Sequence, residues 1–247
     1  MKKYELDFIT DSDLFEHTLD TVKKYRFNIN LKEFNKNIVD PIKLTFDSKI
    51  YKKDVRGLIE DEIIRQIDKS NTNHIGYFHQ NIFNYLGNKW HVPDHGFDVE
   101  NSDSFIYVEM KNKHNTMNSS SSQKTYMRMQ NKLLQNTGAT CMLVEVIAKN
   151  SQNIVWKIRL DGMPVSDDRI RRVSIDKFYE IVTGNKYAFR QICQQLPKVI
   201  DDIISTQELD IEKNTVFEEL NSISPDILKS LYLTSFKKYE GFDDFEL

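Results

Sequence analysis

The sequence predicts an α/β fold in which helices flank a central mixed β-sheet, with helical additions at the N-terminal and C-terminal ends. Three observations predict it. Segments typical of strand, strand, helix, strand and strand follow one another between residues 96 and 158. The segments before and after this stretch show helical periodicity. Hydrophobic residues make up 39% of the 247 residues and charged residues 29%, a balance typical of a chain that buries a core.

The N-terminal third is predicted to be helical. The first helix covers residues 11–24, and Pro41 interrupts the pattern that follows. A second helix is expected over residues 54–67, because apolar residues recur there at helical spacing. A third covers residues 75–86 and ends at Gly87, since glycine favours the left-handed conformation found after helices.

The middle of the chain predicts the sheet. The expected strands cover residues 96–100, 104–111, 140–148 and 154–158. The turn-forming residues 101–103 separate the first two strands, which therefore form a hairpin. A helix over residues 122–135 follows the hairpin and precedes the long apolar strand. This order predicts a mixed sheet, because a helical crossover joins parallel strands.

The C-terminal part is expected to be helical from about Ile175 to Ile204 and beyond. Residues 201–247 contain 12 acidic and 4 basic residues. We therefore predict one main domain of residues 1–205 and an acidic helical appendage of residues 206–247.

Composition also predicts where the protein works. No run of 18 apolar residues occurs, so no membrane span is expected. The residues after Met1 show no apolar signal region. Cys141 and Cys193 are too few for a disulfide framework, and a reducing cytoplasm is the expected compartment.

The charge distribution favours a polyanionic partner. The whole chain carries a net charge of −3, and residues 201–247 carry −8, so the first 200 residues carry +5. No acidic residue occurs between Met110 and Val144, and that window contains five basic residues: Lys111, Lys113, Lys124, Arg128 and Lys132. Such a basic, acid-free stretch is typical of a contact with nucleic acid.

The end of the second hairpin strand carries a candidate active site. Because side chains alternate along a strand, Glu109 and Lys111 share a face with Tyr107, while Met110 points to the other. The hairpin brings Asp98 towards this end. Two carboxylates with the Met110 carbonyl suit Mg²⁺, and Lys111 can orient a water molecule, which together predict phosphodiester hydrolysis. A Glu-x-Lys pair at a strand end is more often a solvated ion pair, but the hairpin and the basic loop favour the site.

The helix and loop after Lys111 are the candidate DNA-binding surface. Lys124, Arg128 and Lys132 are spaced by four residues and form one stripe that suits backbone phosphates. The alternative is a solvated helix face. The other candidates are polar residues of the loop and of the helix start: Lys113, His114, Asn115, Asn118, Ser119 and Ser120. These side chains can reach base edges and phosphates, but they also suit an ordered turn.

Three stretches carry a resemblance to a known family. They are Val108-Glu-Met-Lys-Asn-Lys-His-Asn-Thr-Met-Asn-Ser-Ser-Ser-Ser122, Gly96-Phe-Asp-Val99 and Tyr77-Phe-His-Gln-Asn81. The sequence over residues 25–204 resembles bacterial type II restriction endonucleases, most closely those that cut GGNCC or GGWCC. Asp98, Glu109 and Lys111 match the signature of the PD-(D/E)xK superfamily.

The resemblance implies a restriction-endonuclease-like core and a Mg²⁺-dependent homodimer. Such an enzyme cuts a short palindrome in double-stranded DNA and leaves 5′-phosphate and 3′-hydroxyl ends, and a cognate DNA methyltransferase protects the host sites. Asp94 follows a proline as the superfamily name suggests, but it reads as a turn residue, so Asp98 is the better ligand. Glu62 and Gln80 are possible additional site residues. Two alternatives stay open: a structure-specific repair or junction nuclease on the same core, and a non-catalytic DNA-binding module.

Overall fold

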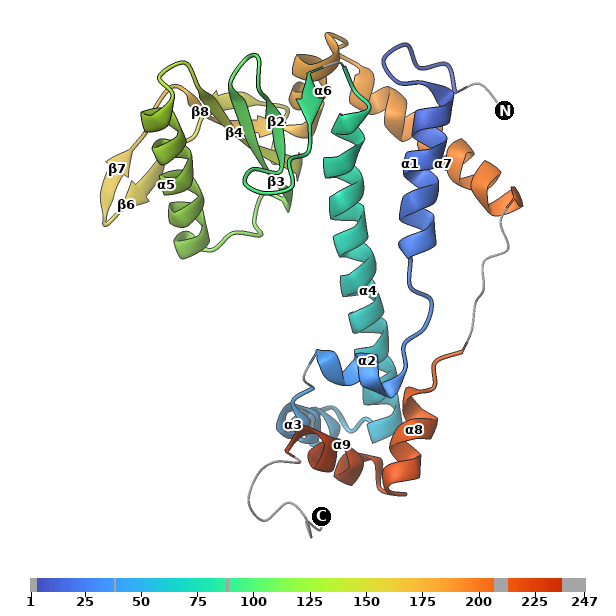
Figure 1. Ribbon diagram of the computed structural model, residues 1–247. Helices are drawn as coiled ribbons and strands as arrows, with labels where there is room; N and C mark the ends of the chain where they lie inside the picture. Colours follow the sequence, from blue (N-terminus) through green and yellow to red (C-terminus); the bar gives the residue numbers. More distant parts are fainter. Residues whose placement is uncertain (1–3, 38, 88, 207–212, 237–247) are drawn as a thin grey trace. The chain divides into compact units, whose positions relative to one another are not determined.

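The computed structural model describes residues 4–37, 39–87, 89–206 and 213–236 (Figure 1). The chain divides into two compact units. The sheet unit comprises residues 1–23 and 75–208, and the helical unit comprises residues 24–74 and 209–247. Each unit is therefore assembled from segments that lie far apart in the sequence. No helix in the described ranges is both long and apolar enough to cross a lipid bilayer.

The sheet unit contains the strands and the helices that cover them. Its helical elements are α1 (Asp11–Lys24), the C-terminal part of α4 (Val55–Asn81), the 3-10 helix η1 (Ile82–Asn84), α5 (Ser119–Gln135), α6 (Ile175–Thr183) and α7 (Ala188–Thr206). Its strands are β1 (Trp90–His91), β2 (Val99–Asn101), β3 (Ile106–Lys113), β4 (Thr140–Ile147), β5 (Asn153–Val155), β6 (Ile158–Leu160), β7 (Met163–Val165) and β8 (Ile170–Ser174).

The main sheet has the strand order β1-β2-β3-β4-β8-β5, and β6 and β7 form a separate hairpin. Strands β3, β4 and β8 are parallel, whereas β1, β2 and β5 pair antiparallel at the two sides. Helix α5 makes the crossover from β3 to β4 that parallel pairing requires. The predicted mixed sheet with flanking helices is confirmed. Strand β8 was not predicted, because Ile170-Arg-Arg-Val-Ser174 lacks an apolar run.

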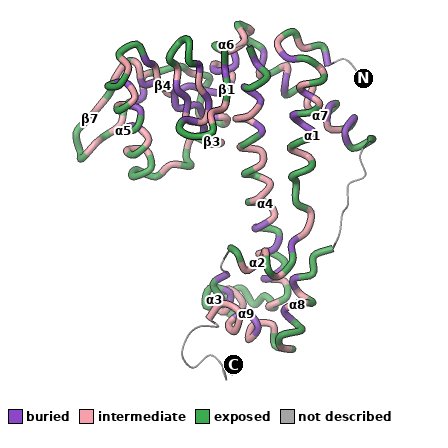
Figure 2. Tube along the Cα trace, viewed as in Figure 1, coloured by how far each residue is buried: buried purple, intermediate pink, exposed green. Residues whose placement is uncertain are grey.

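Two apolar clusters cover the two faces of this sheet. Val108 and Met110 pack in a cluster with Phe78 of α4 and Phe178 of α6. On the opposite face Tyr107 belongs to a cluster that includes Tyr126, Met129 and Leu133 of α5 together with Trp156. Figure 2 shows the buried residues concentrated where the strands meet these helices. The predicted alternation along β3 is therefore confirmed, and Glu109 and Lys111 lie on the α5 face.

Helix α4 joins two helices that the sequence predicted separately. It runs without interruption from Val55 to Asn81. The polar stretch Asp68-Lys-Ser-Asn-Thr-Asn73 lies between the two predicted helices and carries no apolar residue. Polar residues do not end a helix when they face solvent, and no proline or glycine occurs between Gly57 and Gly76.

The helical unit is built by the C-terminal segment and residues 24–74 together. Its elements are α2 (Leu31–Lys36), α3 (Pro41–Tyr51), the N-terminal part of α4, α8 (Val216–Ile223) and α9 (Ile227–Ser235). Val216 and Leu220 of α8 pack in one apolar cluster with Phe34, Leu44 and Ile59. The division differs from the expected boundary at residue 205, because a short amphipathic helix must bury its apolar side against a partner. Residues 207–212 and 237–247 of the expected appendage lie outside the described residues.

Candidate active site

Asp98 lies directly before β2 and is held from three directions. Its backbone N–H donates to the Val108 carbonyl at 2.8 Å, and its own carbonyl accepts from the Gln80 side-chain amide at 3.0 Å. Its carboxylate oxygen Oδ2 accepts from the backbone N–H of Met110 at 2.7 Å. Oδ1 has no hydrogen bond within the described part of the chain. The half-buried carboxylate is therefore fixed against the middle of β3 with one oxygen available to a ligand.

Asp94 has a different setting. It lies in the bend before Gly96, and its side chain is exposed. The Asp94 carboxylate makes no hydrogen bond or ion pair with any residue that the structure describes. The contrast agrees with the preference for Asp98 as the ligand, since Asp98 alone of the two is bonded to the backbone beside Glu109.

Glu109 and Lys111 meet on the α5 face of β3. The Lys111 ammonium Nζ donates to Glu109 Oε1 at 2.8 Å, and the guanidinium of Arg128 on α5 bonds to Oε2. The Glu109 side chain is only 12% exposed. Two cations therefore compensate one largely buried carboxylate.

The three side chains of the predicted basic stripe on α5 make different contacts. Besides its bond to Glu109, the Arg128 guanidinium lies 4.5 Å from the centre of the Phe97 ring. Lys132 Nζ lies 4.2 Å from the centre of the Tyr107 ring. Arg128 and Lys132 thus contact residues of the sheet side, although Arg128 is 44% exposed, whereas Lys124 is exposed and makes no such contact. Their placement on α5 matches the expectation, but Lys124 is the stripe member best placed for a phosphate contact.

The loop between β3 and α5 is anchored at both ends. His114 donates its backbone N–H to the Ile147 carbonyl at 3.0 Å, and its Nδ1 lies 3.3 Å from the same oxygen. Asn118 caps α5 by accepting from the backbone N–H of Ser121. The remaining predicted contacts, Lys113, Asn115, Ser119 and Ser120, are exposed. Asn118 therefore has a structural task, and the exposed residues are free to meet a ligand.

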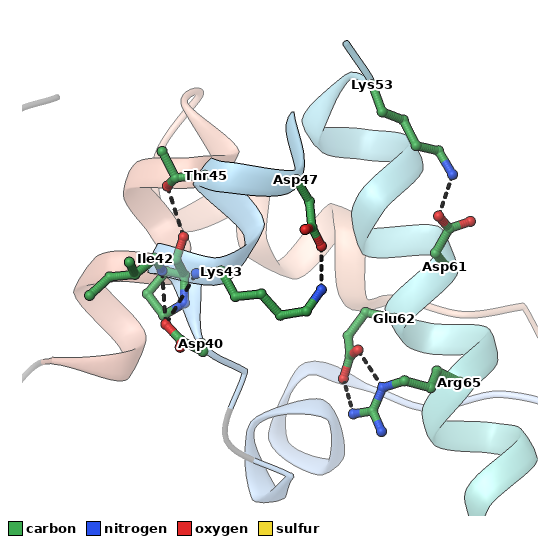
Figure 3. A network of polar contacts seen from close by, with 10 residues as sticks. Asp40, Ile42, Lys43, Thr45, Asp47, Lys53, Asp61, Glu62 and Arg65 are labelled. Carbon is green, nitrogen blue, oxygen red and sulfur yellow. Dashed lines mark hydrogen bonds and ion pairs between the residues drawn. The ribbon is translucent and has the colours of Figure 1, made fainter. Parts of the chain in front are cut away.

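Two predicted extra residues lie on α4. Gln80 supports Asp98 through the carbonyl bond described above. Glu62 belongs to the helical unit, where its carboxylate accepts from the Arg65 guanidinium (Figure 3). It also accepts from the Gln66 side-chain amide. These bonds lower the pKa of Glu62 against the opposing effect of its burial. None of the described contacts of Glu62 involves Asp98 or Glu109.

His79, next to Gln80, makes stability depend on pH. Burial lowers its pKa to about 4, with a smaller effect from His17. The side chain in the unfolded state has a pKa of about 6.5, so between these two pH values the unfolded state binds more protons than the folded state. The free energy of unfolding should therefore fall as the pH drops through this window, by up to about 1.4 kcal/mol per pH unit.

Denaturant unfolding at pH 7 and pH 5 measures this effect in the parent and in His79→Gln, which should lose much less stability. His91→Gln is the control, because His91 is exposed. Equal pH dependence of parent and His79→Gln would contradict the assignment.

Glu145 and Arg172 were not predicted to belong to the site. Glu145 lies on β4 directly beside Lys111 in the parallel register and is 1% exposed. Arg172 of β8 donates through Nε to Glu145 Oε1 at 2.9 Å and through its terminal nitrogen to the His114 carbonyl at 3.1 Å. The sequence does contain a signal for Glu145, because it is the one charged residue inside the apolar run of residues 140–148.

The donor set suits a small divalent cation. No group of three or more His, Cys, Asp and Glu side chains that could hold a metal occurs in the described ranges. Mg²⁺, however, binds through one or two carboxylates and keeps several waters. Asp98 offers a free oxygen, and Glu109 presents two oxygens that already attract cations. The residues present therefore fit this metal.

Comparison with known proteins decides the family. The model of the Eco47II restriction endonuclease family matches residues 6–205. The chain belongs to the Eco47II restriction endonuclease family. It is similar to the type II restriction enzyme Sau96I of Staphylococcus aureus, with 32% identity over 214 residues that cover 82% of each chain.

The type II restriction enzyme Eco47II of Escherichia coli is 27% identical over 213 residues, which cover 81% of this chain and 88% of that enzyme. These matches confirm that this member of the Eco47II restriction endonuclease family is a type II site-specific deoxyribonuclease. DNA is therefore its substrate. The family match covers residues 6–23 and 75–205 of the sheet unit and residues 24–74 of the helical unit.

Proposed function

We propose that the protein hydrolyses phosphodiester bonds of double-stranded DNA at a short palindromic GGNCC-like site, with Mg²⁺ as cofactor. The products are 5′-phosphate and 3′-hydroxyl ends. The observation that supports this proposal most is the hydrogen bond that joins Asp98 to strand β3, which carries Glu109. The Met110 N–H binds the Asp98 carboxylate, and Glu109 and Lys111 pair on the same strand.

The roles follow from these contacts. Asp98 and Glu109 supply carboxylate oxygens to the metal, and the Met110 carbonyl is the third protein ligand. When bound, Mg²⁺ neutralises charge on the phosphate and lowers the pKa of a coordinated water. Lys111 holds the attacking water in line with the scissile bond, and Arg128, released from Glu109, is placed to meet a phosphate oxygen. Gln80 keeps Asp98 in position through the backbone.

The palindromic site accounts for the proposed assembly. Both strands of a palindromic DNA site carry the same half-site sequence. Two copies of one chain that are related by a two-fold axis can therefore each bind one half-site and cut one strand. We propose a homodimer for this reason, in the bacterial cytoplasm. A DNA methyltransferase of the same specificity would protect the host sites without forming a complex.

Digestion of one plasmid tests the proposal against its rivals. With Mg²⁺, a sequence-specific enzyme yields discrete fragments whose sequenced ends share one motif. A structure-specific nuclease instead cuts branched DNA and leaves linear plasmid intact, and a non-catalytic module leaves every substrate uncut. Discrete fragments without a common terminal motif would contradict the proposed specificity.

Lys124→Ala should weaken DNA binding without changing its specificity. Lys124 is exposed on α5 and makes no described contact with the site, so it is expected to meet a backbone phosphate. Binding of cognate and non-cognate duplexes in Ca²⁺ should fall by a similar factor. The slope of log K against log salt should become shallower by about 1.

Lys132→Ala is the matched control for this measurement. It removes the same charge from the same helix, but the ammonium lies over the Tyr107 ring. Its salt slope should change less than that of Lys124→Ala. A loss confined to cognate DNA would show that Lys124 reads a base, and an unchanged slope would show that it faces only solvent.

A further inference from the structure

A second buried carboxylate lies beside the proposed catalytic lysine. β4 runs between β3 and β8, and the register places Glu145 next to Lys111, on the same face of the sheet. Neighbouring strands are about 4.8 Å apart. Arg172 approaches from the β8 side and bonds to Oε1 alone. Oε2 of Glu145 is buried and has no hydrogen-bond partner within the described residues.

Glu109 shows the opposite arrangement. Lys111 occupies its Oε1 and Arg128 its Oε2, so no oxygen of this carboxylate is free of a cation. A divalent cation that binds Glu109 must therefore displace at least one of the two. Arg128 is 44% exposed and can turn to solvent or phosphate, whereas the Lys111 side chain is 29% exposed and needs a nearby acceptor.

We propose that Glu145 is a positioning residue that receives the Lys111 ammonium when Glu109 takes up the metal. The flexible lysine stem lets the ammonium move from Glu109 Oε1 to Glu145 Oε2 while the strand stays fixed. Arg172 holds Glu145 still by bonding its other oxygen and the His114 carbonyl. The exchange keeps Lys111 charged, hydrogen-bonded and aimed at the water that it orients.

This role rests on the proposed function, because it assumes a divalent cation at Glu109. It explains why Glu145 Oε2 is buried with no hydrogen-bond partner among the described residues, which a purely structural ion pair does not explain. A buried carboxylate oxygen without a partner costs free energy, and such a cost is retained where a second state uses the group. Lys111 is the flexible cation in register with Glu145 on β3, while Arg172 on β8 is already bonded.

Glu145→Gln tests the proposal because glutamine keeps the size and can still accept from Arg172. The Ca²⁺ concentration that half-saturates binding of a GGNCC-containing duplex should rise by about ten- to hundredfold, the worth of one charge-assisted hydrogen bond. Affinity for the duplex at saturating Ca²⁺ should stay close to that of the parent. The melting temperature should fall, because Arg172 loses its counter-charge, so binding and cleavage are measured well below it. The single-turnover cleavage rate in Mg²⁺ should fall by a similar factor.

The same substitution in a Lys111→Ala background separates positioning from a general loss of negative charge. If Glu145 acts through Lys111, Glu145→Gln should leave the Ca²⁺ requirement of the Lys111→Ala protein unchanged. Asp167→Asn is the matched control, since it breaks the Asp167–Arg169 pair that precedes β8. It should change neither the Ca²⁺ requirement nor the cleavage rate.

The structure of the parent with Ca²⁺ and duplex DNA provides a test without a variant. Lys111 Nζ should lie within hydrogen-bond distance of Glu145 Oε2. A lysine still bonded to Glu109, or an equal effect of Glu145→Gln in both backgrounds, would overturn the proposal. A parent that takes up no divalent cation with the duplex would instead overturn the proposed function, so the two failures are distinguishable.

Discussion

Replacing Lys111 by alanine should abolish DNA cleavage and leave specific DNA binding largely intact. Lys111 bonds to Glu109 and carries the proposed water-positioning role, whereas phosphate contacts are assigned to other residues. Loss of a positioned group of this kind costs about 10²–10⁴-fold in rate. The measurement is single-turnover cleavage in Mg²⁺, with duplex affinity in Ca²⁺ measured on the same preparation.

Lys113→Ala is the matched control for Lys111→Ala. Lys113 lies two residues further along β3 and is exposed, so the substitution removes one positive charge from the same strand. It should weaken binding modestly and leave the rate of the bound complex near that of the parent. Cleavage by Lys111→Ala at more than a few per cent of the parent rate would remove Lys111 from the mechanism.

Asp98→Asn should reduce metal-dependent cleavage by about a thousandfold or more. Loss of a metal-held charge at a phosphoryl centre removes several kcal/mol of transition-state stabilisation. The asparagine carbonyl can still accept from the Met110 N–H, so the loop should keep its conformation. The melting temperature should therefore stay close to that of the parent while the rate and the Mg²⁺ affinity fall.

Asp94→Asn tests whether the loss of activity is specific to the carboxylate of Asp98. Asp94 is also acidic, lies four residues upstream and is exposed, so its substitution should cost little activity. Both variants are compared by cleavage rate over a range of Mg²⁺ concentrations. An inactive Asp94 variant beside an active Asp98 variant would move the site assignment to the bend before Gly96.

Patterns among residues that are close in sequence were sufficient to predict the centre of the sheet. The alternation of polar and apolar residues along β3 predicted that Glu109 and Lys111 share a face, and turn chemistry predicted the hairpin with β2. Helix α5 followed from its apolar spacing. The first helix was predicted with the bounds Asp11–Lys24 that α1 has in the structure. Each of these inferences uses residues that are close in sequence.

Long-range pairing explains what the sequence did not predict. The Glu145–Arg172 pair joins two strands that are separated by β5, β6 and β7 in the chain, so its members are 27 residues apart. The direction in which Arg128 points depends on Glu109 and Phe97, which no helical wheel contains. The partner of the C-terminal helices lies in residues 24–74, and charge composition carries no information about that packing.

Periodicity and short motifs are local, so the residues alone predicted the α/β class, the carboxylate and lysine at the end of β3 and the resemblance to type II restriction endonucleases. The folded chain was needed to reveal that Asp98 bonds to the Met110 N–H, that two cations share Glu109 and that a second carboxylate lies beside Lys111. These contacts depend on strand order and register. A sheet sets both through packing between distant segments, and no local pattern encodes that packing.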